Sequence, residues 1–233
     1  MFSPYHRLAN CSRLERTITG LIASSNIPAP LLSQHNKYHY SLLHKLSSAK
    51  VHLENLQDAL ENTDVHTLLP NSAEFVNRVN MHIDSFFYCC GSALDILARE
   101  VLIYYNLTLP ARVYFHVAAS ELTTHRPGDS LIPRLASPPW KAEFSDYRNA
   151  LTHEVLIGTN FSIQVNADGP INTTFIVFPL PNDPRIDILS RVFSRNPNAY
   201  VYCKTTFTRI LSLVNTIHGE LDSKITTLGS LPL

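Results

Sequence analysis

The chain has 233 residues, of which 45% are hydrophobic and 16% are charged, a composition typical of a folded globular protein and unlike that of a disordered one. Its 19 basic residues balance its 19 acidic residues, so no long-range field draws it to a polyanion and any nucleic-acid contact must be local. The N-terminus does not resemble a leader and no apolar run approaches bilayer length, which predicts a cytoplasmic protein without a membrane partner.

The first thirty residues have weak periodicity and end in Ile27-Pro-Ala-Pro30, so residues 1–30 are predicted to be an N-terminal appendage. A long helix is predicted next, from about Leu31 to Asn62, because apolar residues recur at three- and four-residue spacing. These residues are Leu42, Leu46, Ala49, Leu53, Leu56 and Leu60.

A second long helix is predicted from Ser72 to about Asn106, since Pro70-Asn71-Ser72 supplies a breaker and a capping residue. Its apolar stripe is continuous and includes Val79, Ile83, Phe86, Cys90, Leu97 and Val101. Cys89 and Cys90 lie within this apolar run and are interpreted as buried thiols, because the four cysteines of the chain lack the spacing of a metal or disulfide motif.

Proline-rich residues 110–139 predict a loop with a short helix near Tyr114 to Leu122. A third core helix is predicted from Pro139 to about Leu156. Its apolar face consists of Trp140, Phe144, Tyr147, Leu151 and Val155.

Two β-branched and aromatic runs, Phe161–Val165 and Thr174–Phe178, predict a β-hairpin with a turn at Asn166–Pro170. A last helix is predicted from about Asn198 to Ser223. The predicted fold is therefore mainly α. It is an up-and-down helical bundle of four core helices over residues 31–225, with the hairpin (about residues 160–178) inserted before the last helix and a tail at 226–233.

The third helix carries the candidate catalytic residues Arg148, Asn149 and His153. Arginine can hold a phosphate by planar charge-assisted hydrogen bonds, and histidine can transfer a proton near neutral pH. At about 100° per residue, Arg148 falls on the shoulder of the apolar face, whereas Asn149 and His153 lie nearly opposite it. Another surface must then cover them: the hairpin, the loop before Pro139 or, as we favour, a second copy of the chain related by a two-fold axis.

The string Arg148-Asn149-Ala-Leu-Thr-His153 resembles the R-x(4–6)-H motif of the HEPN superfamily of helical-bundle ribonucleases and nucleotide-binding domains, which has a polar residue after the arginine. Phe86–Asp95 is similar to part of the second core helix of those domains, and the resemblance covers about Leu31 to Ser223. It implies a metal-independent endoribonuclease without a cofactor, acting as a homodimer on an RNA substrate in a toxin, defence or stress system, with an antitoxin or regulatory protein as a possible partner.

The resemblance also implies the role of each residue. His153 is expected to act as general acid or base, Arg148 to stabilise charge on the phosphate, and Asn149 to orient the phosphate or the imidazole. Val155 stands where toxins paired with a nucleotidyltransferase antitoxin usually carry tyrosine, so control by tyrosine modification is not expected. The alternative is a non-catalytic HEPN-like module that binds a nucleotide, RNA or a protein, with Arg148 paired to Asp146 or a neighbouring helix.

Other polar residues predict ordinary surface roles. His35 and His39 are four residues apart, a spacing that can chelate zinc, but no carboxylate or cysteine lies near them in the sequence, so they are expected to be exposed. The same expectation applies to His52, His66 and His125. Asp84 and Asp95 are expected to be solvated residues of the second helix, although they could reach the polar groups around Arg148. The chain has no phosphate-binding glycine loop and no nucleophile elbow.

Overall fold

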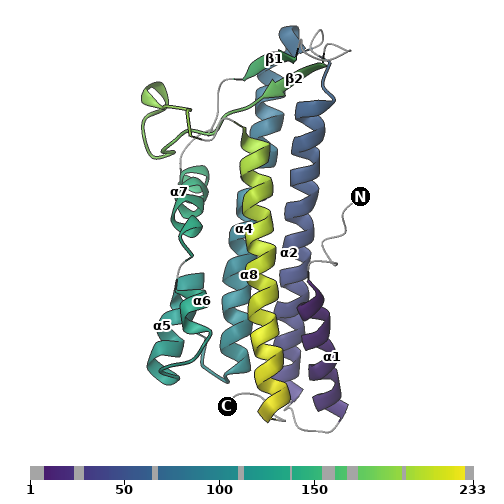
Figure 1. The fold of residues 1–233 in the computed structure, drawn as a ribbon, viewed down its shortest axis with the longest axis vertical. Helices are drawn as coiled ribbons and strands as arrows, with labels where there is room; N and C mark the ends of the chain where they lie inside the picture. The colour runs from purple at the N-terminus through teal and green to yellow at the C-terminus, as the bar shows by residue number, and fades with distance from the viewer. Residues whose placement is uncertain are drawn as a thin grey trace. The chain divides into compact units, whose positions relative to one another are not determined.

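The structure is a computed structural model that describes residues 8–23, 29–64, 68–109, 113–136, 138–153, 161–166, 173–195 and 198–228. It is mainly helical, with a two-stranded antiparallel hairpin before the last helix (Figure 1). The helices are α1 (Ala9–Ala23), α2 (Ala29–Glu61), α4 (Ser72–Tyr104), α5 (Phe115–His125), α6 (Ile132–Leu135), α7 (Trp140–His153) and α8 (Ala199–Leu228). The strands are β1 (Ser162–Asn166) and β2 (Thr173–Val177), and the short 3-10 helices are η2 (Leu69–Asn71) and η3 (Ile188–Ser190).

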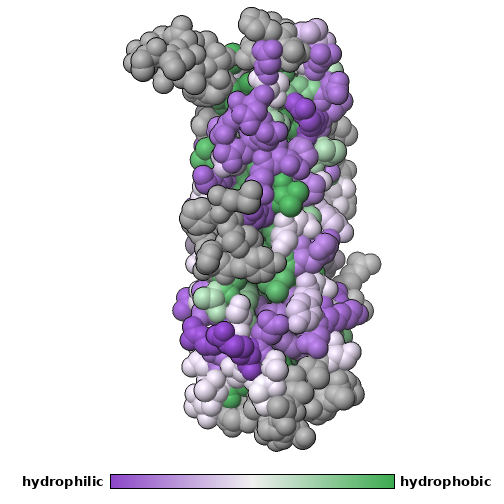
Figure 2. Space-filling model, turned by 90° about the vertical axis from the view of Figure 1, so that its right-hand side faces the viewer, coloured by the Kyte–Doolittle hydropathy of each residue, from purple (hydrophilic) through white to green (hydrophobic). Residues whose placement is uncertain are grey.

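Contacts between Cα atoms divide the chain into two compact units, each containing part of α2, α4 and α8. The first unit contains residues Met1–Ser47, Cys90–Lys141 and Thr208–Leu233, and the second contains Ser48–Cys89 and Ala142–Phe207. No helix of the described residues has an apolar stretch long enough to cross a membrane. On the face drawn in Figure 2, hydrophilic and hydrophobic side chains are interspersed.

The three long helices confirm the sequence prediction, because each begins and ends within a few residues of the expected position. Their apolar stripes are buried as expected, including all six residues of the α2 stripe and the α4 residues Val79, Ile83, Phe86, Cys90, Leu97 and Val101. The α8 residues Cys203, Phe207, Ile210, Val214, Ile217 and Leu221 are buried as well. All four cysteines are buried free thiols, as interpreted for Cys89 and Cys90.

Just after α4 ends, one residue adopts the left-handed backbone conformation. Asn106 has a φ of 50°, its N–H donates to the Ile103 carbonyl, and the Leu107 N–H donates to the Leu102 carbonyl. This pair of hydrogen bonds is the Schellman arrangement, which satisfies carbonyls at a helix end, and asparagine adopts the left-handed conformation more readily than most residues. The chain therefore leaves α4 at this point.

Residues 1–30, expected to be an appendage, contribute α1 to the first unit. Figure 1 shows α1 beside α2. Its buried residues include Cys11, Leu14 and Ile18, and Thr17 Oγ1 donates to Asp222 Oδ1 of α8 over 2.6 Å. The three- and four-residue spacing of these apolar residues is that of a helix with one buried face.

The hairpin pairs Ser162 with Val177 and Asn166 with Thr173, so each strand is shifted by one residue from its predicted position. Phe161, at the base of the hairpin, packs edge-on against Phe75 of α4 at 5.2 Å between ring centroids. This contact, within the second unit, places the hairpin against α4. Most of the predicted turn at 166–170 and the predicted end of the third helix, including Val155, lie outside the described residues.

Candidate functional sites

Helix α7 is held in the second unit by buried aromatic rings. Phe144 and Tyr147 are 2% and 0% exposed, and both pack on Phe87 of α4, at 5.4 and 5.6 Å between ring centroids. The Tyr147 ring also meets Tyr202 of α8 edge-on at 5.1 Å, and its hydroxyl donates to the Pro181 carbonyl. These contacts fix the rotation of α7 about its axis, and therefore which of its residues face away from the rings.

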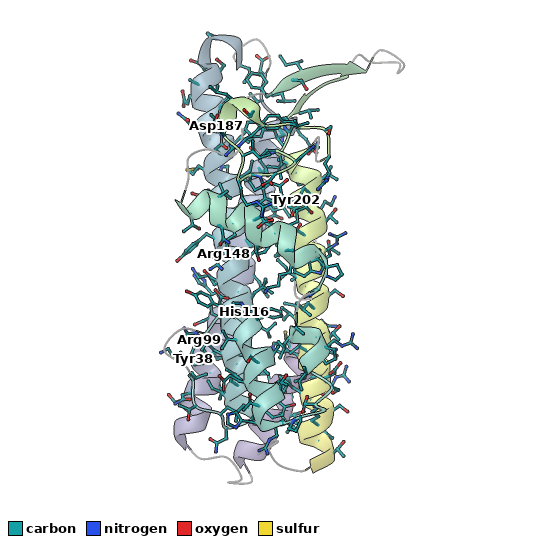
Figure 3. All side chains as sticks on the ribbon, turned by 90° about the vertical axis from the view of Figure 1, so that its left-hand side faces the viewer. Tyr38, Arg99, His116, Arg148, Asp187 and Tyr202 are labelled. Carbon is teal, nitrogen blue, oxygen red and sulfur yellow. The ribbon has the colours of Figure 1, made fainter. Side chains whose placement is uncertain are left out.

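Arg148 and Asn149 directly follow the buried Tyr147 in α7, and Arg148 is labelled in Figure 3. Arg148 is half-buried and Asn149 is exposed, as their positions on the shoulder and far side of the helix predict. His153 is the last residue of α7, one turn after Asn149, and its side chain lies outside the described residues. Arg148 and Asn149 therefore have the exposure that their positions on the helix predict. That Arg148 and His153 act together on one phosphate stays a prediction.

Sequence reasoning missed a second arginine that lies against α7. Arg185 Nη1 is 3.6 Å from Asp146 Oδ1, and its Nη2 is 2.8 Å from Asp183 Oδ2. Hydrogen bonds from the Arg185 side chain and backbone lower the pKa of Asp183 to about 2. Because Asp146 and Asn149 are three residues apart on the helix, the Arg185 guanidinium and its two carboxylate partners lie on the side of α7 where Asn149 lies.

The second unit also contains an open polar cavity of about 410 Å³ between residues of α2 and α4. It is lined by Asn55, Asp58, Ala59, Asn62, Thr63, Asp64, Arg78 and His82. His82 Nδ1 is 3.4 Å from Nδ1 of His52, which is half-buried rather than exposed as predicted. Burial lowers the pKa of both histidines, so both are neutral near pH 7 and one ring donates to the other.

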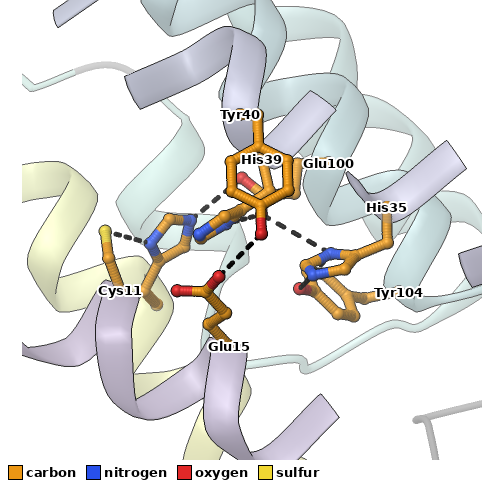
Figure 4. A network of polar contacts seen from close by, with 8 residues as sticks. Cys11, Glu15, His35, His39, Tyr40, Glu100 and Tyr104 are labelled. Carbon is orange, nitrogen blue, oxygen red and sulfur yellow. Dashed lines mark hydrogen bonds and ion pairs between the residues drawn. The ribbon is translucent and has the colours of Figure 1, made fainter. Parts of the chain in front are cut away.

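The first unit contains a buried polar cluster that sequence reasoning missed (Figure 4). Glu100 of α4 is 0% exposed, and each of its carboxylate oxygens meets an imidazole. His39 Nδ1 of α2 is 2.8 Å from Oε1, and His218 Nε2 of α8 is 3.0 Å from Oε2. The side chains of these three residues meet although they come from three different helices.

The prediction that His35 and His39 are exposed is wrong. They are 4% and 1% exposed, because the α2 face that carries them packs in the interior of the first unit. The carboxylate that appeared to be missing is Glu100, which lies 61 residues from His39 in the sequence. His125 is exposed as predicted, and His66 lies outside the described residues.

The histidines of this cluster have different ionisation properties. Burial alone would lower the pKa of His39, but its hydrogen bond to Glu100 and the negative charges of Glu100 and Glu15 together raise it. Burial dominates at His35 and lowers its pKa to about 4. Burial alone would raise the pKa of Glu100, but the charge of His218 and the hydrogen bonds from His218 and His39 hold it well below its usual range. Glu100 is therefore a buried carboxylate anion.

Two further residues complete the surroundings of the cluster. Cys11 Sγ of α1 is 2.7 Å from His218 Nδ1, and the Tyr104 hydroxyl is 2.6 Å from His35 Nδ1. Burial raises the pKa of the Cys11 thiol, so its sulfur faces His218 Nδ1 as a neutral thiol, while His218 Nε2–H donates to Glu100. The His218 ring is thus oriented from both sides.

Asp84 is exposed as predicted. Asp95 is half-buried and accepts a hydrogen bond of 3.1 Å from the Phe115 N–H, at the start of α5 in the first unit. Its carboxylate satisfies one of the backbone donors that a helix leaves unpaired at its beginning. Asp95 therefore has a structural role that its position in the sequence did not indicate.

Neither a protein-family model, nor a curated protein, nor a solved structure matches this chain. A functional assignment must therefore come from the residues themselves. Two groups carry recognisable chemistry: the exposed side of α7 with Arg148 and Asn149, and the buried set of His39, Glu100 and His218.

Proposed function

We propose that the chain is a metal-independent endoribonuclease of the HEPN type, with Arg148, Asn149 and His153 of α7 as its active-site residues. The observation that carries the proposal is that Arg148 and Asn149 follow a tyrosine fixed in the core, so the motif stands on a helix that cannot rotate freely. The proposal includes the up-and-down bundle of four core helices, the homodimer and action in the cytoplasm, with an antitoxin or regulatory protein as partner.

In the proposed reaction His153 removes the proton of a ribose 2′-hydroxyl, and the 2′-oxygen attacks the adjacent phosphorus. The bond from phosphorus to the 5′-oxygen breaks, and that oxygen receives a proton, leaving a 2′,3′-cyclic phosphate and a 5′-hydroxyl. Arg148 donates hydrogen bonds to the phosphate oxygens, on which negative charge develops. Two histidines from two-fold-related chains would supply the base and the acid.

A phosphate contact at α7 would need a cation next to the motif. The chain has no net charge, so RNA would be bound through the few cations next to the motif. Arg185 lies 3.6 Å from Asp146 of α7 and is 62% exposed, and it would contact a phosphate in exchange for one of its two carboxylate partners. We expect Arg185→Ala to weaken RNA binding more than it slows cleavage of bound RNA.

The proposal is tested by incubating the purified chain with single-stranded RNA in buffer free of divalent cations and comparing it with Arg148→Ala and His153→Ala. Each substitution should lower the cleavage rate by about 100-fold or more, the range associated with a lost general acid or base and a lost charge-stabilising donor. His125→Ala, which removes an exposed histidine from α5, should cleave like the parent chain.

Cleavage at equal rates by all four proteins would rule out the mechanism, as would a parent chain that cleaves no RNA. Binding of RNA or a nucleotide without cleavage, weakened by Arg148→Ala, would instead identify the chain as a non-catalytic binding module.

A further inference from the structure

The buried cluster of the first unit has the donor set of a transition-metal site. His39, Glu100 and His218 offer two imidazole nitrogens and one carboxylate oxygen, and the three ligand atoms lie within 4.8 Å of one another. Two histidines with one carboxylate are a common ligand set for zinc and for other divalent first-row metals. All three side chains belong to the first unit and come from α2, α4 and α8.

The distances suit an ion after small adjustments. Zinc binds imidazole nitrogen and carboxylate oxygen at about 2.0–2.2 Å, so neighbouring ligand atoms of a tetrahedral ion are roughly 3.4 Å apart. In the structure each imidazole nitrogen is 2.8 or 3.0 Å from a Glu100 oxygen. The two N–H groups that now point at Glu100 would lose their protons, and each of these nitrogen–oxygen distances would increase by a few tenths of an ångström.

His39 supplies an independent observation. Its Nε2 is buried and has no hydrogen-bond partner among the described residues. Such an atom is uncommon in a protein interior, where polar groups are normally paired. Within the described part of the chain His39 hydrogen-bonds only to Glu100, so turning its ring to present a nitrogen to an ion would break no other hydrogen bond.

His218 has the support that metal-binding histidines usually have. Its Nδ1 lies 2.7 Å from Cys11 Sγ, so the ring is oriented through the nitrogen that does not face Glu100. When a metal takes Nε2, the ring proton moves to Nδ1 and can be donated to the sulfur. Cys11 would thus position His218 without itself being a ligand.

We propose that His39, Glu100 and His218 bind one divalent transition-metal ion of the zinc class, which joins α2, α4 and α8 in the interior of the first unit. The ion would pair with the fully buried Glu100 carboxylate in place of the imidazole N–H groups that now face it. Because the three side chains are 1% exposed or less, the site would stabilise the fold rather than act on a substrate. This inference is independent of the ribonuclease proposal, whose assay contains no added divalent ions.

The first test measures metal in the parent chain. After expression with zinc and removal of loosely bound ions, elemental analysis should find one zinc per chain. Adding zinc to the stripped protein at about 100 times Kd should raise Tm by roughly 5–10 °C, whereas magnesium, which prefers oxygen ligands, should not. Cobalt should give visible absorption bands of a nitrogen- and oxygen-bound ion, and zinc should abolish them.

The second test compares variants. Glu100→Gln and His218→Asn should weaken zinc binding by about 100-fold or more, since each removes a ligand, whereas Cys11→Ala should weaken it by only about 10-fold, as expected for a residue that orients a ligand. His52→Asn, which removes a half-buried α2 histidine of the second unit, should bind zinc like the parent chain.

Should a ligand variant fail to fold, the cobalt bands and metal content of the parent chain still decide the question. A parent chain that holds no zinc, gives no cobalt bands and gains no stability from either ion would overturn the proposal, and so would variants that bind zinc as tightly as the parent.

Discussion

At the scale of single residues, environment decides what a charged side chain does. Asp129, in the loop after α5, accepts hydrogen bonds from Lys224 Nζ at 2.6 Å, Tyr105 hydroxyl at 2.7 Å and Leu131 N–H at 2.8 Å. Burial alone would raise its pKa, but the hydrogen bond from Lys224 and those from Leu131 and Tyr105 lower it. Asp129 therefore links Tyr105, the residue directly after α4, to α8 in the first unit, a role that its place in a proline- and glycine-containing loop does not indicate.

We expect Asp129→Asn to lower the free energy of unfolding at pH 7 by about 1–3 kcal/mol, since it weakens charge-assisted hydrogen bonds. The pKa of Asp129 is lower in the folded chain than its ordinary value of 3.8, so its contribution is complete above that value and is lost as the pH falls through the folded-state pKa. The difference between variant and parent should stay constant from about pH 5 to 8 and shrink below about pH 4.

Urea unfolding of both proteins across this pH range measures the effect. Glu54→Gln is the control, because Glu54 forms an exposed ion pair with Lys50 and should change stability by less than about 1 kcal/mol. A difference between Asp129→Asn and the parent that grows on acidification would contradict the assigned role.

At the scale of elements, α7 depends on a few buried rings. Only part of its surface is buried, and its fixed position comes from Phe144 and Tyr147 packing on Phe87 of α4. Single-sequence periodicity predicted the apolar face of α7, but not which ring of the second unit receives it. The same holds for the hairpin, whose strands were predicted within one residue and whose contact with Phe75 was not.

We expect Phe87→Ala to lower the free energy of unfolding by about 3–5 kcal/mol, because it removes a fully buried ring and leaves a cavity beneath α7. Tyr88→Ala, at the next position of the same helix, should change stability by less than about 1 kcal/mol, since Tyr88 is 58% exposed. Thermal unfolding compares the two. Equal losses of stability in the two variants would show that packing on Phe87 does not hold α7 in place.

At the scale of the whole molecule, the sequence predicted one shared core, which stays a prediction, and contacts between Cα atoms divide the chain into two compact units that each contain part of the three long helices. The apolar stripes of α2, α4 and α8 run without a break from one unit into the other, so periodicity alone gives no sign of a division. The division arises from which segments contact one another, a property of the folded chain.

The proposed ribonuclease should be a dimer of the 26.2 kDa chain, measured by light scattering or native mass spectrometry. Mixing the parent chain with an excess of His153→Ala should lower its cleavage rate, because a mixed dimer keeps only one of the two histidines that supply the base and the acid. An active monomer would disprove the shared site while leaving the catalytic residues in place.

The sequence by itself determined the long helices, their buried faces, the hairpin and the position of the Arg148 motif, because helix and strand periods are local properties of the chain. Only the tertiary structure decided that His39 and His218 meet Glu100, since these residues lie 61 and 118 positions from it. The spacing of apolar residues indicates which face of a helix is buried, but not which other helix covers that face. His39, which resembles a surface residue in the sequence, is therefore part of a buried polar cluster in the first unit.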